Sequence, residues 1–200
     1  MSATVSKNNS NKANQNVAPH WHAQATEIQK FGTVIEDMPH VLSATIRKKM
    51  TDSLNILLAD TISIRDMYKK HHWQVSGPTF YQLHLLFDKH YEEQAEIADG
   101  IGERIQLLGG ISVAMGSDVA KLTQITAPPM GREEVPVQIS RLLEAHKIIM
   151  KECGDIIKAS EDTEDWGSND LVMSDVLRPN EVQSWFIGQH LVEMPLILAK

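Results

Sequence analysis

Hydrophobic residues recur at helical spacing along four long stretches of the chain, and the first stretch begins near Val41. Apolar side chains three and four positions apart share one face of a helix, so the spacing predicts an amphipathic helix over residues 41–73. The Ser-Gly-Pro sequence at 76–78 ends this helix, because glycine and proline break helices most strongly. The apolar positions of this stretch are Leu42, Ile46, Met50, Leu54, Leu57, Leu58, Ile62 and Met67.

Three more helices are predicted after this break, over about residues 79–108, 132–160 and 171–198. The first of them has Thr79 as its N-cap and the pair Gly109-Gly110 as its C-terminal signal. The last is expected to bend near Pro179. The connector at 111–131 is expected to hold a short helix, and no stretch shows the alternation of a β-strand. The pattern therefore predicts an all-α four-helix bundle with a short helix between its second and third helices.

The chain divides near residue 40 into an N-terminal extension, residues 1–40, and one helical domain, residues 41–200. Residues 1–24 are rich in Asn, Ser, Ala and Gln. Few large apolar side chains are present there to offset the entropy cost of ordering, so we expect the extension to be largely flexible.

The composition is that of a globular protein, with 42% hydrophobic and 22% charged residues. A net charge of −7 argues against a strong electrostatic hold on nucleic acid and suits a protein that gathers cations. Cys153 is the only cysteine, so no disulfide forms within one chain. No apolar run is long enough to span a membrane and no signal peptide is apparent, so we expect a cytoplasmic protein with no membrane partner.

Four potential metal ligands share one stripe of the second predicted helix. Their angles at 100° per residue, measured from His84, are about 40° for Asp88, 60° for Asp99 and 100° for Glu103. His72 lies five residues before the glycine of the break and His84 lies seven residues after it. In an antiparallel helix pair the two histidines therefore lie at a similar height. Imidazole nitrogens and carboxylate oxygens at one level can hold iron, zinc or manganese.

This stripe is too long for one metal ion in one chain. Asp99 is fifteen residues from His84, which is about 22 Å at 1.5 Å per residue of helix. Either the acidic pair has separate partners elsewhere in the bundle, or a second copy packs antiparallel about a two-fold axis and brings its acidic pair to the first copy's histidines. A third interpretation is an ordinary solvated helix face without a metal.

The run HHWQVSGPTFYQLHLLFDKHYEEQAEIADGIGERIQLLGG, residues 71–110, resembles the signature of the Dps family, the mini-ferritins named as DNA-binding proteins from starved cells. The matching features are His-Trp at 72–73, Ser-Gly-Pro-Thr-Phe at 76–80, Leu-His at 83–84, Asp88, Asp-x-x-x-Glu-Arg at 99–104 and Leu-Gly-Gly at 108–110. The resemblance covers about residues 41–198 and leaves the extension unaccounted for. The one visible departure is Gly102, where the family usually has alanine.

The resemblance implies a ferritin-like four-helix bundle that assembles into a hollow dodecamer built from two-fold dimers. It implies a ferroxidase centre between two-fold-related subunits, with Glu103 as the firmest ligand. Trp73 resembles the family tryptophan beside the centre, as a quencher of radicals or as a packing residue. One subunit would supply His72, His84 and Asp88, and the other would supply Asp99 and Glu103.

The implied activity is oxidation of Fe(II), preferably by hydrogen peroxide, with storage of ferric mineral and protection against oxidative damage. Iron is the expected metal, and zinc competes for the same ligand types. The internal alternative is an ordinary ferritin site within one bundle, but none of the nine histidines has a glutamate three residues before it. The alternative function is a nucleoid-associated protein that condenses DNA through Lys7 and Lys12 of the tail and binds metal only incidentally.

Two further groups of residues are candidates outside this centre. Asp165 and Asp170 resemble the carboxylates that line the family's three-fold iron-entry pores, or they belong to a solvated acidic loop with a helix cap. The candidates for an additional tail metal site, as in some relatives, are His20, His22, Asp37 and His40. The histidines expected to be structural or exposed are His71, His90, His146 and His190.

Overall fold

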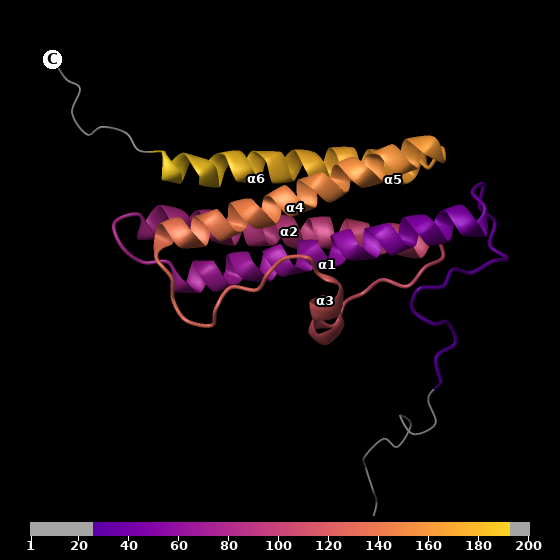
Figure 1. Cartoon of the computed structure of the whole chain (residues 1–200), viewed down its shortest axis with the longest axis horizontal. Helices are drawn as coiled ribbons and strands as arrows, with labels where there is room; N and C mark the ends of the chain where they lie inside the picture. Colours follow the sequence, from indigo (N-terminus) through magenta and orange to yellow (C-terminus); the bar gives the residue numbers. More distant parts are fainter. Residues whose placement is uncertain (1–25, 193–200) are drawn as a thin grey trace, which may run out of the picture.

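The computed structural model describes residues 26–192, which form an all-α bundle without a strand in that range (Figure 1). The first three long helices are α1 (Ala44–Gln74), α2 (Phe80–Leu107) and α4 (Val135–Asp162). The fourth is one continuous segment made of α5 (Trp166–Asp170), the π-helix η2 (Leu171–Leu177), α6 (Arg178–Gly188) and the 3-10 turn η3 (Gln189–Leu191). The short helix α3 (Gly116–Leu122) lies in the connector, so the predicted bundle with its extra short helix is confirmed.

Local signals define the turn between α1 and α2. Ser43 caps the start of α1, since its Oγ accepts a hydrogen bond from the Ile46 backbone N–H at 3.3 Å. After α1 the chain passes through Gly77, whose φ of +99° favours glycine. Thr79 holds the N-cap position of α2, as predicted, but its side chain makes no capping hydrogen bond. Its backbone, at φ −98° and ψ 13°, lacks the extended conformation that a capping side chain needs.

The other end of α2 follows its predicted glycine signal. Gly109 has a φ of +79°, and its N–H donates to the Gln106 carbonyl at 2.8 Å. The Gly110 N–H donates to the Ile105 carbonyl at 2.9 Å, which completes the helix terminus. A Cβ atom on Gly110 would lie only 2.7 Å from Cγ2 of Thr51, so glycine also permits the close approach of α1 to α2.

The last residues of the predicted extension are held against the junction of α1 and α2. Arg47 of α1 is buried and donates to the Leu108 carbonyl at 2.9 Å and the Glu36 carbonyl at 3.2 Å. The Ile35 N–H donates to the Gly109 carbonyl at 2.9 Å. This part of the chain is therefore attached to the bundle, whereas residues 1–25 lie outside the described range.

The core lies where α1 packs against α2 and α4, and where α4 packs against α6. Core side chains with no exposed surface include Leu54, Leu57, Ile64, Leu83, Ile101, Ile105, Ile139, Leu142, Ile149 and Ile187. Burial of each such side chain contributes about 1.5–3 kcal/mol relative to exposure, so this apolar set fixes the register of the helices. Within residues 26–192, no helix has both the length and the apolar character needed to cross a membrane.

The irregularity predicted near Pro179 takes the form of a π-helical segment. Pro179 lies in the first turn of α6, directly after η2. Proline has no N–H, and its ring collides with the carbonyl four residues earlier, so α-helical bonding cannot continue unchanged through the preceding turn. The backbone stays right-handed helical at Leu177 and Arg178, and the fourth helix therefore continues past the proline.

Candidate metal centre

The structure brings His72 and His84 together at the turn between α1 and α2. Their ring centroids lie 3.8 Å apart, and the rings are stacked with an interplanar angle of 19°. His72 lies in the last turn of α1 and His84 in the second turn of α2, so the antiparallel pair places them at one height, as their spacing about the break predicts. Both side chains are half-buried.

Reciprocal hydrogen bonds hold the two imidazoles in a defined tautomer. Nδ1 of His72 lies 2.8 Å from the His84 carbonyl oxygen, and Nδ1 of His84 lies 2.9 Å from the His72 carbonyl oxygen. A carbonyl oxygen only accepts, so each Nδ1 carries a proton and donates. In the tautomer with the proton on Nδ1, Nε2 of each ring has a free lone pair. A metal-binding histidine commonly fixes its ring by donating the other N–H to a carbonyl in this way.

Asp88 lies beside this pair on α2. Its Oδ1 is 3.8 Å from Nδ1 of His72 and accepts a hydrogen bond from Nζ of Lys69 on α1. The Lys69 hydrogen bond lowers the pKa of Asp88 and outweighs the opposite effect of burial, and the charge of Lys69 lowers it further. Asp88 is therefore a carboxylate at neutral pH.

Asp99 and Glu103 lie farther along the unbroken helix α2, and both side chains are exposed. Neither makes a hydrogen bond or ion pair with any other residue between 26 and 192. In that same range no group of three or more His, Cys, Asp or Glu residues could hold a metal ion within one chain. The first alternative, separate partners for the acidic pair within the bundle, is therefore not what the described residues show.

Large apolar residues close in sequence to the two histidines are exposed. Trp73 is 72% exposed, and Phe80, Tyr81 and Leu85 are exposed as well. We call these four residues the Trp73–Leu85 patch. The Phe80 ring stacks on His84 with centroids 5.1 Å apart. Large apolar side chains gathered on a surface mark a contact site for another molecule, so packing of Trp73 within its own chain does not describe its position.

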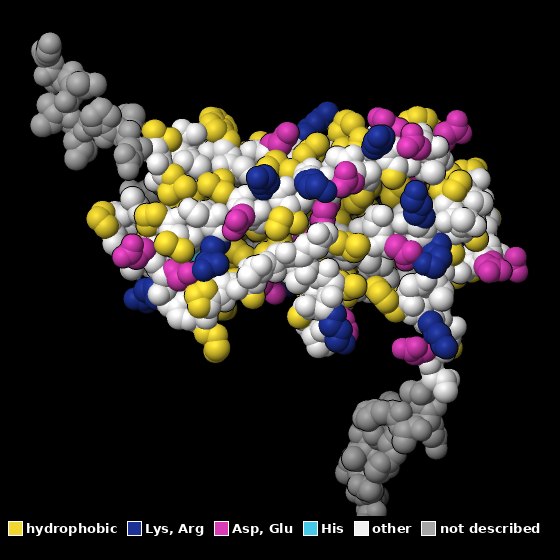
Figure 2. Space-filling view, viewed as in Figure 1, with side chains coloured by type: hydrophobic (Ala, Val, Ile, Leu, Met, Phe, Trp, Pro, Cys, Tyr) yellow, Lys and Arg dark blue, Asp and Glu magenta, His cyan; other side chains and the backbone are white. Residues whose placement is uncertain are grey.

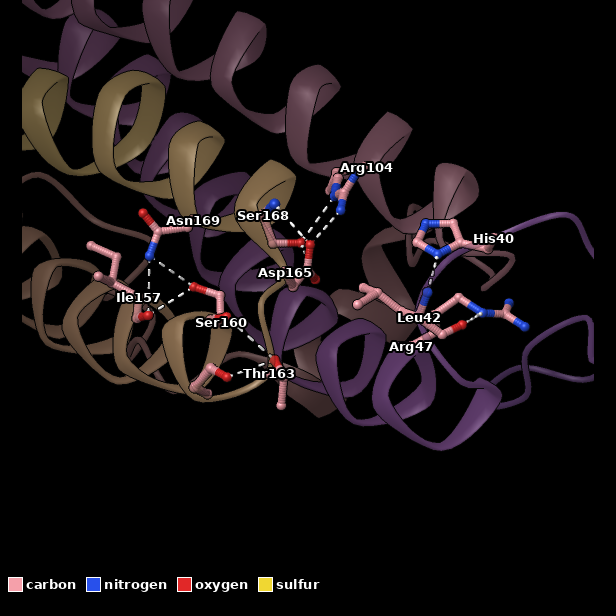
Figure 3. Close-up of polar contacts among 11 residues, drawn as sticks. His40, Leu42, Arg47, Arg104, Ile157, Ser160, Thr163, Asp165, Ser168 and Asn169 are labelled. Carbon is pink, nitrogen blue, oxygen red and sulfur yellow. Dashed lines mark hydrogen bonds and ion pairs between the residues drawn. The ribbon is translucent and has the colours of Figure 1, made fainter.

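Asp165 and Asp170, the candidate pore carboxylates, differ in their exposure to solvent. Asp165 is only 1% exposed and caps α5, since its Oδ1 accepts from the Ser168 N–H at 3.1 Å (Figure 3). Arg104 donates to the same carboxylate at 2.5 Å, and Ser168 Oγ donates to Oδ2 at 2.7 Å. This burial fits the helix-cap interpretation of Asp165 rather than a pore-lining carboxylate. Asp170 is exposed and alone keeps the pore role as a proposal.

The ion pair of Asp165 gives Arg104 a role that sequence analysis missed. Arg104 follows Glu103 in the Asp-x-x-x-Glu-Arg motif and also donates through Nε to Ser168 Oγ at 2.9 Å. A Cβ atom on Gly167 would lie 2.8 Å from Nη1 of Arg104, so a glycine makes room for the guanidinium. Arg104 therefore ties α2, next to Glu103, to the start of the fourth helix. The arginine of the Asp-x-x-x-Glu-Arg motif is the sequence feature that could have indicated this role.

The tail candidates remain predictions. His20 and His22 lie outside the described residues. Nδ1 of His40 accepts a hydrogen bond from the Leu42 N–H at 3.0 Å, so a neutral His40 carries its proton on Nε2 and has no free lone pair for a metal (Figure 3). Asp37 is exposed.

The remaining histidines are structural or exposed, as predicted. His71, His90 and His146 are buried, and His190 is exposed. Burial lowers the pKa of His71 to about 4, of His90 to about 4 and of His146 to about 3, so all three are neutral at pH 7.

The sequence and fold are similar to those of known proteins. A family model described as a ferritin-like domain matches residues 51–197. The solved structure of DpsC from Streptomyces coelicolor is 49% identical, covers 86% of this chain and 99% of its own, and has a TM-score of 0.84. An uncharacterised protein of Kitasatospora aureofaciens is 47% identical over 68% of this chain and 91% of its own length. DNA protection during starvation protein 1 of Deinococcus radiodurans is 26% identical over 72% of this chain and 69% of its own length.

The bundle and the match over residues 51–197 define a ferritin-like protein. With the similarity to DpsC over most of both chains, this protein belongs to the Dps family. The resemblance carried by residues 71–110 is thereby confirmed.

Proposed function

We propose that the protein oxidises Fe(II), preferably with hydrogen peroxide, at a site shared by two subunits, and stores the ferric product. Removal of both reagents protects against oxidative damage. The observation that carries the proposal is the His72–His84 pair, whose reciprocal hydrogen bonds keep both Nε2 lone pairs available beside the charged Asp88. Such a mixture of imidazole and carboxylate ligands suits Fe(II), and it also admits zinc as a competing ion.

The second half of the site would come from the two-fold partner. Asp99 and Glu103 are exposed and without partners among the described residues, and the length of α2 separates them from His84 by about 22 Å and about 28 Å. An antiparallel partner would bring its acidic pair to these histidines and complete two equal sites. The Trp73–Leu85 patch supports this arrangement, because the same contact would cover its apolar side chains. We propose that six such dimers form the dodecamer implied by the family.

The chain's own residues account for the chemistry in outline. Reduction of one peroxide takes two electrons, which two Fe(II) ions supply. Carboxylates such as Asp88 and Glu103 are hard oxygen ligands that stabilise the Fe(III) product, while the histidines hold Fe(II) before reaction. The peptide carbonyls that fix both imidazole rings keep the nitrogens ready for each new ion.

The test is stopped-flow oxidation of Fe(II) with peroxide consumption followed in parallel. Wild-type protein should oxidise about two Fe(II) per peroxide, as the electron count requires. His72→Ala and Glu103→Ala should lose the fast phase while the assembled mass is kept. His190→Ala and Glu92→Ala remove an exposed histidine and an exposed glutamate, and both should leave the rate unchanged. A wild-type rate in Glu103→Ala would overturn the proposal.

The same preparation tests the competing function, DNA condensation with incidental metal binding. The net charge is −7, and on the face in Figure 2 lysine and arginine side chains are interspersed with aspartate and glutamate. Strong binding would therefore need the tail, whose Lys7 and Lys12 lie outside the described residues. A tight gel shift at physiological salt that is lost on deleting residues 1–24, without peroxide-coupled oxidation, would favour this function.

A further inference from the structure

A polar chain runs through the core of the bundle. It joins Tyr68 of α1, His90 of α2, His146 of α4 and Asn180 of α6, and all four side chains are buried. The Tyr68 hydroxyl lies 2.6 Å from Nε2 of His146 and 3.1 Å from Nδ1 of His90. Nδ1 of His146 lies 2.8 Å from Oδ1 of Asn180. One residue from each long helix thus takes part in this core polar chain.

The backbone fixes the direction of these hydrogen bonds. Asn180 Nδ2 donates to the Val176 carbonyl at 2.7 Å, so Oδ1 of Asn180 is the acceptor. Nδ1 of His146 therefore carries a proton and donates to Asn180, which leaves Nε2 of His146 as a base. Tyr68 donates its only hydroxyl proton to that base, and His90 donates from Nδ1 to the Tyr68 oxygen.

Tyr68 is thus a buried phenol whose hydroxyl proton is hydrogen-bonded to a neutral imidazole. Burial raises the pKa of the Tyr68 hydroxyl well above its usual value and lowers the pKa of His146 to about 3, so both groups are neutral at rest. Removal of an electron reverses this balance, because a phenol cation radical is a far stronger acid than the phenol. The proton can then pass to His146 along the existing 2.6 Å hydrogen bond.

Tyr68 also lies close to the proposed iron site. It precedes His72 by four residues on α1, which is about 6 Å along the helix axis. Its ring packs on Phe87 with centroids 5.9 Å apart, and Phe87 precedes Asp88 on α2. The next residue of α1, Lys69, is hydrogen-bonded to Asp88. A buried electron donor therefore lies within about one helical turn of two proposed ligands.

We propose that Tyr68 is a redox-active residue that gives one electron to the peroxide reaction when a single Fe(II) occupies the site, while its phenolic proton passes to His146. This inference rests on the proposed iron oxidation. The O–O bond of hydrogen peroxide breaks as it takes one electron from Fe(II) and one from Tyr68, and two solvent protons complete two water molecules. The products are Fe(III), a neutral Tyr68 radical and His146 protonated on Nε2.

Such a donor would prevent the one-electron reduction of peroxide. A lone Fe(II) supplies only one electron, and one-electron reduction of peroxide yields hydroxide and a free hydroxyl radical. The second electron from Tyr68 avoids that product. The oxidised centre is then a tyrosyl radical held in the core, where Tyr68 has no exposed surface.

The test uses the full, assembled chain with one Fe(II) per His72–His84 pair, mixed with peroxide and frozen for electron paramagnetic resonance. The chain has three tyrosines, so the half-buried Tyr91 and Tyr81 of the Trp73–Leu85 patch give the controls, each as a phenylalanine variant that keeps the aromatic ring and is checked for unchanged assembled mass. We expect a tyrosyl signal that persists in Tyr81→Phe and Tyr91→Phe and is lost in Tyr68→Phe. Narrowing of the signal with ring-deuterated tyrosine distinguishes it from a tryptophan radical.

The base is tested by His146→Gln. The glutamine oxygen can accept the Tyr68 hydrogen bond but cannot take up the proton, so we expect loss of the signal with retained helicity and assembled mass. Spin trapping should detect more hydroxyl radical in Tyr68→Phe than in wild type. A signal that survives in Tyr68→Phe overturns the assignment. So does a signal that disappears in Tyr81→Phe or Tyr91→Phe, which leave the hydrogen bonds of Tyr68 in place.

An iron-free arm separates this inference from the proposed function. A photogenerated ruthenium(III) oxidant is applied to the Tyr81→Phe, Tyr91→Phe double variant, in which any tyrosyl radical is on Tyr68. We expect a radical that forms more slowly in D2O and is lost with His146→Gln. If wild type oxidises Fe(II) but neither arm gives a tyrosyl radical, the Tyr68 role is rejected and iron oxidation stands. If Fe(II) is not oxidised at all, the proposed function fails, and with it the peroxide step assigned to Tyr68.

Discussion

Glu152→Gln should stabilise the protein at neutral pH and have little effect in acid. Asp60 of α1 is fully buried, and its Oδ1 accepts from the Gln124 N–H at 2.7 Å, from the Ile125 N–H at 3.3 Å and from the Thr123 hydroxyl. The other oxygen, Oδ2, and Oε2 of Glu152 on α4 are both buried, and neither has a donor among residues 26–192. Burial, and then the charge of Asp60, raise the pKa of Glu152 from 4.5 to about 8.

The magnitude follows from proton linkage. The folded state holds Glu152 protonated while the unfolded chain ionises above pH 4.5, so stability is fully present below pH 4.5 and falls as the pH rises toward about 8. At 1.36 kcal/mol per unit, the loss by pH 7 is at most about 3.4 kcal/mol. Lys151 opposes this shift and Glu152 is only half-buried, so we expect a gain of about 1–3 kcal/mol for Glu152→Gln at pH 7. The glutamine amide can still donate to Asp60.

The assay is denaturant unfolding at fixed protein concentration between about pH 4.5 and pH 7.5, because assembly makes stability depend on concentration. Glu144→Gln removes an exposed carboxylate from the same helix and should change stability by less than about 0.5 kcal/mol at every pH. Destabilisation by Glu152→Gln at pH 7, or a gain that does not shrink in acid, would refute the argument that Glu152 is protonated beside Asp60 in the folded state.

Three further predictions follow from buried groups and one glycine. The pKa of His146 is about 3 in the folded state and 6.5 in the unfolded chain, so the contribution of His146 to stability is full above pH 6.5 and should fall by about 2.7 kcal/mol by pH 4.5, measured as the part of the acid loss in thermal unfolding that His146→Gln removes. Arg104→Ala leaves the Asp165 carboxylate buried without its cation and should cost about 3 kcal/mol in denaturant unfolding. Gly102→Ala should raise stability by about 0.5–1 kcal/mol with no change in iron oxidation, since its Cβ meets only Leu58 and Ser112 at 3.9 Å.

Each of these predictions has a contradicting result. The acid loss should be smaller in His146→Gln, and an unchanged pH profile in that variant would assign the loss elsewhere. Asp165→Asn keeps an oxygen to cap α5 and should lower the free energy of unfolding by less than Arg104→Ala does. The reverse order would show that the ion pair does not explain the stability effect. Loss of oxidation in Gly102→Ala would show that the departure from the family at this position matters.

The sequence predicted the helices because their apolar periodicity is local. The four long helices, the short connector helix and the Gly109-Gly110 terminus all depend on residues a few positions apart. Thr79 shows the limit of this argument, since the capping residue type was present but the backbone at that position was not extended.

The sequence predicted those parts of the site that depend only on the pairing of α1 with α2. The spacing about Gly77 placed His72 and His84 at one height, and the length of α2 separated Asp99 from them. The burial of Asp165 was not predictable in this way, because it depends on Arg104, which lies 61 residues earlier in the chain.

The spacing of residues along single helices could not predict the core polar chain. Tyr68 and His146 are 78 residues apart, and neither sequence neighbourhood marks the other as its partner. The buried carboxyl pair of Asp60 and Glu152 likewise forms only when α1, α4 and the residues that directly follow α3 pack together. Contacts across three elements need the tertiary register, which helical periodicity does not supply.

Subunit mixing tests the shared iron site most directly. His72→Ala and Glu103→Ala subunits, each inactive alone, are dissociated together, reassembled at equal ratio and assayed for fast Fe(II) oxidation. Random pairing makes half of the two-fold dimers mixed, and each mixed dimer has one intact site of two, so about a quarter of wild-type activity should return. No recovery from verified mixed dimers would place both ligands within one subunit and contradict the account.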